Sequence, residues 1–152
     1  DVTTGAALGV MGSLPTLYTQ QPIGVARVDG SIYVFAIDNF SSLQYTRIDS
    51  NGVVSPWFDT GVKARSVAAV TAPRPDGKKV VYVLAVNAAY RIVHAEVTPT
   101  SWLGWIAEPV DGFTTAVPAM TADSVLYVKS FDGRYYRRPL GSTAGWTTLS
   151  NI

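Results

Sequence analysis

Tryptophan and arginine side chains carry most of the binding chemistry that this sequence offers. Trp102 lies in the segment TPTSWLGW and stands outside any repeating pattern of the chain. An aromatic face stacks on the C–H face of a sugar ring, while the sugar hydroxyls need charged or polar partners. We therefore expect Trp102 to be an exposed stacking residue in a loop. Arg47, Arg91, Arg137 and Arg138 are candidates for the polar partners.

The densest group of such residues is RYYRR, at positions 134–138. In an extended strand, alternation places Tyr136 and Arg138 on one face and Tyr135 and Arg137 on the other. We expect Tyr136, Arg137 and Arg138 to contact a sugar, an acidic partner or a phosphate-bearing surface. An equally good interpretation is that these arginines simply form the solvated face of an outer strand.

Few side chains in this sequence are suited to binding a metal or a cofactor. His94 is the single histidine, and there is no cysteine. These counts exclude a thiolate zinc site and a cysteine nucleophile, and no calcium-type acidic loop is present. His94 is either a polar group at a ligand pocket or, as we favour, an interior histidine with satisfied ring nitrogens. We expect no cofactor and no metal.

Hydrolase chemistry is equally poorly supported. A serine hydrolase would have to use His94, and the G-x-S-x-G turn that exposes its nucleophile is absent. A glycosidase needs only two carboxylates, but Asp29, Asp76 and Asp132 each precede a glycine and fit hairpin turns better. We therefore predict a protein that is not an enzyme, with glycoside hydrolase as the less favoured alternative.

The remaining tryptophans recur at intervals of about 40 to 50 residues, a spacing typical of repeat folds. Trp57, Trp105 and Trp146 each follow two extended segments. The first segments read SIYVFAIDN, KVVYVLAVNA and SVLYVKSFDG, and the second read SSLQYTRI, YRIVHAEV and RYYRRPL. A run of small residues precedes each pair, and no stretch has a helical period. Each repeat therefore predicts four short antiparallel strands in an all-β chain.

Four short strands every 40 to 50 residues or so form one blade of a β-propeller. We predict blades at 22–63, 64–112 and 113–152, after an N-terminal segment, 1–21, that is a linker or a closing strand. The second strand of each blade should be buried between neighbouring blades. Because propellers close with about four to eight blades, we expect a second copy or a companion chain to complete the ring.

The repeating tryptophans are expected to fill the gaps between adjacent blades. This makes Trp57, Trp105 and Trp146 structural residues first and ligand candidates second. Their surroundings differ, as PWFD, GWIA and GWTT, so three equivalent sites are not expected.

The repeat, with its aspartate–glycine turn, apolar run, aromatic third strand and tryptophan, resembles the lectin-type propellers of bacteria and fungi. These include fucose-binding lectins, Photorhabdus-type lectins and tectonin-like repeats, and the resemblance covers residues 22–152. Tyr45, His94 and Arg137 share one column of the third strand. The resemblance implies that this strand and the tryptophan strand supply polar and stacking groups at pockets between blades.

Composition excludes several other classes of protein. Of the 152 residues, 47% are apolar and 15% are charged, which argues against disorder. A net charge of +1 without a basic stripe argues against nucleic-acid binding, and no apolar run is long enough to span a membrane. We predict a lectin-like module that binds a glycan outside the cell or at its surface, as a homo-oligomer or with a companion chain. The alternative is a protein-interaction or structural propeller fragment of a larger surface protein, which the divergent repeats and the start at Asp1 favour.

Overall fold

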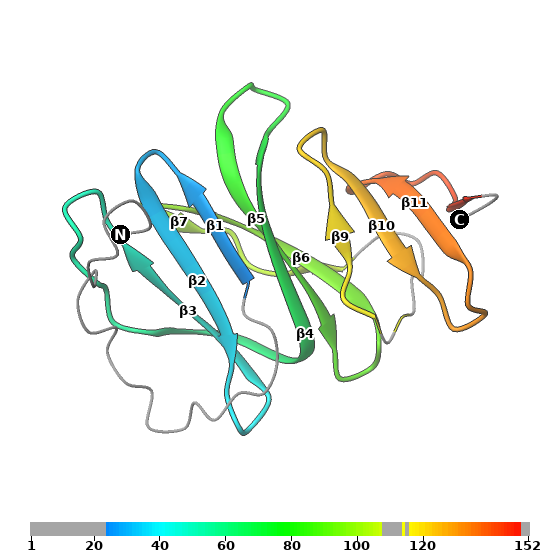
Figure 1. The fold of residues 1–152 in the computed structure, drawn as a ribbon, viewed down its shortest axis with the longest axis horizontal. Helices are drawn as coiled ribbons and strands as arrows, with labels where there is room; N and C mark the ends of the chain where they lie inside the picture. Colours follow the sequence, from blue (N-terminus) through cyan, green and yellow to red (C-terminus); the bar gives the residue numbers. More distant parts are fainter. Residues whose placement is uncertain (1–23, 108–113, 115, 150–152) are drawn as a thin grey trace, which may run out of the picture.

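The computed structural model describes residues 24–107, 114 and 116–149, and every regular element within them is an antiparallel β-strand (Figure 1). The predicted all-β class is confirmed. The N-terminal segment 1–21, predicted to be a linker or closing strand, lies outside the described residues.

The described residues form twelve strands. In chain order they are β1 (Gly24–Val28), β2 (Ser31–Ile37), β3 (Ser42–Ile48), β4 (Phe58–Pro73), β5 (Lys79–Asn87), β6 (Ile92–Thr98), β7 (Ser101–Trp102), β8 (Ile106–Ala107), β9 (Ala119–Met120), β10 (Val125–Lys129), β11 (Tyr135–Pro139) and β12 (Thr147–Thr148).

Strand pairing divides these strands into three units. Unit 1 consists of β1, β2, β3 and residues 58–63 of β4. Unit 2 consists of residues 64–73 of β4 with β5 and β6, and the short strands β7 and β8 both pair with β6. Unit 3 is a separate sheet in the order β12-β11-β10-β9. Each unit is thus an antiparallel meander whose fourth strand follows a tryptophan or contains one.

Strand β4 passes from unit 1 to unit 2 without a loop. Its register with β3 ends at Lys63, its register with β5 begins at Ala64, and the pairing shifts between Ala64 and Ser66. A shift of this kind bends a strand and increases its twist. The change of direction between the two units is therefore built into one 16-residue strand.

The first hairpin shows how turn residues set these short strands. Asp29 and Gly30 connect β1 to β2 with φ angles of 48° and 77°. Two positive φ values match a two-residue turn with the twist of antiparallel strands, and aspartate–glycine is the favoured sequence for it. The predicted hairpin at this position is confirmed by the pairing of Val28 with Ser31.

Unit 2 is buried on both faces of its sheet. Val81 and Val83 of β5 pack into one cluster with residues of unit 1, whereas Leu84 joins a second cluster with Leu126 of unit 3. A strand covered on both sides carries a nearly continuous apolar run. This burial explains the sequence VVYVLAV and agrees with the predicted position of the second strand between neighbouring units.

The inner strands approach one another closely. A Cβ atom added at Gly24 of β1 would lie 3.3 Å from the backbone of Ala68 in β4. Such a distance is tight for any side chain, so the small residues predicted for the first strand of each repeat meet a steric demand here.

Candidate functional site

The repeating tryptophans occupy the same place in each unit. Trp57 directly precedes β4, Trp105 precedes β8 and Trp146 precedes β12. Trp105 packs against the cluster between units 1 and 2, and Trp146 packs against the cluster between units 2 and 3. These two rings therefore fill the gaps between adjacent units. Trp57 is half-buried in unit 1.

The predicted column of the third strand is reproduced by the register. Tyr45, His94 and Arg137 lie opposite the residues that directly follow the three tryptophans, namely Phe58, Ile106 and Thr147. The three side chains nevertheless have different surroundings. Tyr45 is half-buried, His94 is 6% exposed and Arg137 is exposed.

An aromatic cluster closes the gap between units 1 and 2. The ring of Trp102 stacks on Tyr45 with centroids 5.6 Å apart, and it meets Trp105 edge-on at 5.4 Å and Phe58 at 6.0 Å. The indole nitrogen of Trp105 donates a hydrogen bond to the carbonyl oxygen of Thr60 at 3.0 Å. Burial raises the pKa of the Tyr45 hydroxyl.

This cluster corrects the expectation for Trp102. The residue was expected to be exposed in a loop, but it lies in β7, paired with Val97 of β6, and its ring is half-buried. Trp102 is therefore packed against other rings, whereas the sequence predicted an exposed stacking residue.

Arg47 lies at the edge of the same gap. Its guanidinium Nη1 donates a hydrogen bond to the carbonyl oxygen of Pro99 at 3.3 Å, which connects β3 of unit 1 to the turn between β6 and β7. Burial raises the pKa of Tyr33, and the nearby positive charge of Arg47 opposes part of that rise.

The side chain of His94 is buried among the described residues. It pairs with Leu84 and shares with it the face of the sheet that packs toward unit 3. This burial agrees with the favoured interpretation of an interior histidine.

The arginines of the RYYRR segment separate onto two faces, as alternation predicts. Arg138 is 1% exposed, and its guanidinium carbon lies 4.6 Å from the ring centroid of Trp146. Tyr136 packs against the same cluster between units 2 and 3. Arg138 was expected to contact a ligand, but its burial against Trp146 makes it part of the packing between units.

Tyr136 also makes a polar contact at the rim of unit 3. Its hydroxyl donates a hydrogen bond to Asp132 Oδ2 at 2.5 Å. This hydrogen bond raises the pKa of Tyr136 and lowers the pKa of Asp132. Arg137, on the opposite face, lines a hollow of about 220 Å³ together with Val125 and Thr147.

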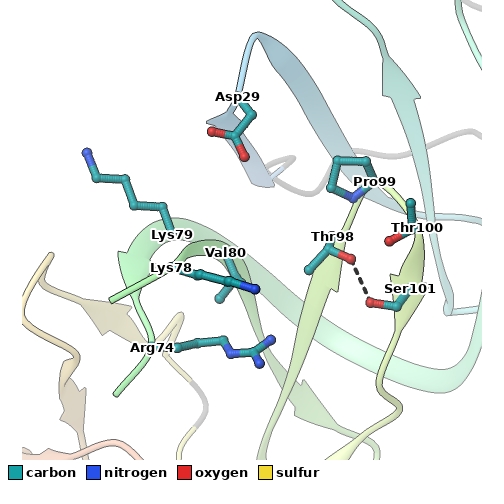
Figure 2. Close-up of a pocket in the computed structure, with 9 residues that line it drawn as sticks. All are labelled: Asp29, Arg74, Lys78, Lys79, Val80, Thr98, Pro99, Thr100 and Ser101. Carbon is teal, nitrogen blue, oxygen red and sulfur yellow. Dashed lines mark hydrogen bonds between the residues drawn. The ribbon is translucent and has the colours of Figure 1, made fainter. Parts of the chain in front are cut away.

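A pocket of about 490 Å³ lies where three turns of units 1 and 2 meet (Figure 2). The turn between β1 and β2 contributes Asp29, the turn between β4 and β5 contributes basic residues, and the turn between β6 and β7 contributes hydroxyls. Its lining residues are Asp29, Arg74, Lys78, Lys79, Val80, Thr98, Pro99, Thr100 and Ser101.

Charges of both signs surround this pocket. Arg74 makes ion pairs of 3.5 Å with Asp76 and with Glu96. Figure 2 shows the side chains of Arg74 and Lys78 extending toward Thr98 and Ser101, whereas Lys79 points away. The hydroxyl oxygens of Thr98 and Ser101 lie 2.6 Å apart and share one hydrogen bond. The pocket thus combines cationic donors, carboxylate acceptors and hydroxyls.

Sequence reasoning missed this pocket, because its residues come from three separate turns. The only sequence signal was the longer first turn of the middle repeat, PRPDGKK, which supplies Arg74 and Lys78. Within residues 24–107, 114 and 116–149, no three His, Cys, Asp or Glu side chains gather closely enough to hold a metal ion. The same residues include no helix that could cross a membrane.

The chain shares its fold with structurally characterised lectins. A fucose lectin from Kordia zhangzhouensis in complex with methyl-fucoside superposes with a TM-score of 0.53 at 14% identity, over 84% of this chain and 99% of the lectin chain. The SapL1 lectin in complex with alpha methyl fucoside superposes with a TM-score of 0.52 at 18% identity, over 86% of this chain. The predicted resemblance to lectin folds is confirmed.

The two lectins differ in how much of them this chain covers. The match spans 46% of the SapL1 chain, so this chain corresponds to less than half of that protein. No family model matches the sequence, and no curated protein matches it. The similarity therefore concerns the fold.

Proposed function

We propose that this chain is a non-catalytic, lectin-like module that binds a glycan outside the cell or at its surface. The observation that carries the proposal is the polar pocket at the three turns of units 1 and 2, on a fold that fucose lectins also have. A volume of about 490 Å³ lies within the range of small-molecule sites.

The polar groups of the pocket suit a sugar because each sugar hydroxyl both donates and accepts hydrogen bonds. Arg74 and Lys78 are donors, and the carboxylate of Asp29 is an acceptor. In the hydroxyl pair of Thr98 and Ser101, one proton is used between the two oxygens and the other remains for a ligand. Hydrogen bonds to charged groups are the stronger ones, so these residues would set orientation and specificity.

Lys78, which lines the pocket, and Lys63, which does not, provide a matched test. On a glycan array, the wild-type chain is expected to bind at least one class of glycan above background. Lys78→Ala is expected to weaken that binding about tenfold, as loss of a charge-assisted hydrogen bond does. Lys63→Ala removes the same charge from an exposed lysine of β4 that does not line the pocket, so its binding should stay at the wild-type level. Absence of binding to any glycan, or equal loss in both variants, would contradict the proposal.

We further propose that the three units are propeller blades, at 22–63, 64–112 and 113–152, and that a second copy or a companion chain completes the ring. The support is that, among the described residues, apolar clusters cover both faces of unit 2 and one face of unit 3. Light scattering on the purified chain measures the mass of the assembly. Twice the chain mass is expected for a ring of two copies. A monomeric mass for the purified chain, with all co-purifying chains removed, would contradict that ring and leave completion by a companion chain as the remaining possibility.

A protein-interaction module is the second candidate, and exposed phenylalanines favour it. Phe40 is 64% exposed and Phe131 is 59% exposed, and both lie in the turn between the second and third strands of their units. Under this alternative, Phe40→Ala and Phe131→Ala would release a co-purifying protein while Lys78→Ala would not. Release of free sugar from a bound glycan would instead indicate a glycoside hydrolase.

A further inference from the structure

The outer face of unit 3 is chemically unlike the equivalent faces of units 1 and 2. Lys129 and Tyr135 pair with each other at the register position that Ile37 and Leu43 occupy in unit 1, and Val86 and Ile92 in unit 2. The four aliphatic residues are at most 5% exposed. Lys129 is exposed, and Tyr135 is 39% exposed.

The next register position shows the same change. Phe35 and Leu84 are fully buried in units 1 and 2, and unit 3 carries a half-buried Tyr127 at that place, opposite the exposed Arg137. In unit 2, the face bearing Leu84 is covered by Leu126 and Val128 of unit 3. The odd-numbered residues of β10 and β11 point the other way, so they form the outer face.

This outer face combines positive charges with aromatic rings. The ammonium nitrogen of Lys129 lies 5.7 Å from the ring centroid of Tyr135. Arg137 pairs across the strands with Tyr127 on one side and Thr147 on the other, and it lines the hollow of about 220 Å³. The face consists of Val125, Tyr127, Lys129, Tyr135, Arg137 and Thr147, together with Pro139.

No carboxylate belongs to this set of described residues. The nearest acidic residues in the sequence are Asp123 and Asp132, in the turns before and after β10. Asp123 accepts a hydrogen bond from the Thr121 hydroxyl, and Asp132 accepts hydrogen bonds from the Tyr136 hydroxyl and the Arg134 amide. The turn pocket between units 1 and 2 differs, since there Arg74 is paired with two carboxylates. The outer face therefore presents positive charge that its own residues do not neutralise.

Dry packing against this face would be costly, because burying Lys129 and Arg137 without partners removes two charges from water. An anionic ligand changes that balance. A guanidinium binds a carboxylate or a sulfate ester through two parallel hydrogen bonds, and tyrosine rings stack on the C–H face of a sugar. An acidic sugar supplies both partners in a single residue.

We propose that the outer face of unit 3 binds acidic glycans, those bearing a carboxylate or a sulfate ester, through Arg137 and Lys129 with Tyr127 and Tyr135 beside the sugar ring. The proposal rests on the carbohydrate-binding function proposed above and adds a ligand class and a second site, distinct from the turn pocket.

Two pairs of ligands test the proposal by calorimetry on the full chain. One pair is a 3-O-sulfated galactoside and the unsulfated galactoside, and the other is a glucuronide and the glucoside. The charged member of each pair is expected to bind at least about tenfold more tightly, and the difference should shrink as salt is added. Arg137→Gln should abolish the difference, Lys129→Gln should reduce it, and Arg65→Gln, an exposed arginine of unit 2, should leave it unchanged.

Each outcome decides for or against the acidic-glycan site. Equal binding of charged and neutral sugars, or a charge preference that survives Arg137→Gln, overturns it while leaving the proposed glycan binding intact. Failure to bind any of the four sugars overturns the acidic-glycan site, whereas the glycan array decides separately on the proposed glycan binding. Competition by inorganic sulfate, or by a DNA oligonucleotide of equal charge, as strong as that of the sulfated galactoside would show that the face selects charge without recognising a sugar.

Discussion

Where unit 1 carries Phe35 and Tyr45, unit 3 carries Tyr127 and Arg137, at the same register position of the same meander. In unit 1 these side chains lie in an aromatic cluster that joins two units. In unit 3 they lie on a face that no described residue of another unit covers. The backbone pattern of the repeat is therefore shared, and the side chains decide whether a face packs or remains accessible.

The comparison also separates two ways of using aromatic residues. Between units 1 and 2, four rings contact one another, with Trp102 at their centre. On unit 3, Tyr135 contacts an ammonium group. Rings that pack on rings exclude a ligand, whereas a ring beside a cation on an open face remains available for stacking.

The largest difference between the two regions is expected for matched truncations of Phe35 and Tyr127. Phe35→Ala leaves a cavity in a fully buried cluster and should lower the free energy of unfolding by about 3–5 kcal/mol. Tyr127→Ala, on the outer face, should cost about 1 kcal/mol or less. Urea denaturation followed by tryptophan fluorescence measures both, and equal losses would show that the outer face of unit 3 is packed in solution.

Adjacent arginines sharpen the same comparison within one strand. Arg138→Ala removes a buried guanidinium from the ring of Trp146 and should lower the free energy of unfolding by about 2–4 kcal/mol. Arg137→Ala should change it by no more than about 0.5 kcal/mol. A large loss from Arg137→Ala in the same denaturation experiment would assign Arg137 to packing and count against its role as a ligand contact.

The buried tyrosines predict sensitivity to alkaline pH. Burial and the neighbouring Glu96 raise the pKa of Tyr82 from 10.0 to about 12. The folded state therefore favours the neutral phenol, so this contribution to stability is intact below pH 10 and is lost as pH rises through about 12. As the pH rises between these two values, the free energy of unfolding of Tyr82→Phe should fall by about 1–2 kcal/mol less than that of the wild type. Parallel loss in both proteins would contradict this assignment.

The smallest effect is expected at the rim of unit 3. Asp132→Asn removes the negative charge that accepts the hydrogen bond of the Tyr136 hydroxyl and stabilises its protonated form. The pKa of Tyr136 should therefore fall toward its ordinary value. Ultraviolet titration of the tyrosines against the wild type detects this shift. Asp123→Asn, in the preceding turn of the same unit, is the control and should leave the titration of Tyr136 unchanged.

The strand pattern of this chain follows from its sequence, because tryptophan spacing, aspartate–glycine turns and apolar runs are local signals. The column of Tyr45, His94 and Arg137 was also predictable for that reason. The register shows that Tyr127 is the equivalent of Phe35 and Leu84, because it pairs with Arg137 as they pair with Tyr45 and His94.

The candidate sites were less predictable, because they depend on contacts between units. Trp102 interrupts the repeat in sequence, yet a short strand brings it onto Tyr45. The turn pocket joins Asp29 to Lys78 and Ser101, and no local pattern indicates that these three turns meet. The charge on the outer face of unit 3 was visible in RYYRR, but which arginine is buried depends on which face meets unit 2.

The unbroken course of β4 has a consequence for cooperativity. Units 1 and 2 share the hydrogen bonds of one strand, whereas unit 3 forms its own sheet. Local opening of units 1 and 2 should therefore occur together, and unit 3 should be able to open while the other two stay closed. In native-state hydrogen exchange, the amides of β5 and β2 should share one opening free energy, and those of β10 should exchange at a lower one. A ligand bound to the outer face of unit 3 would then stabilise the unit that opens most easily.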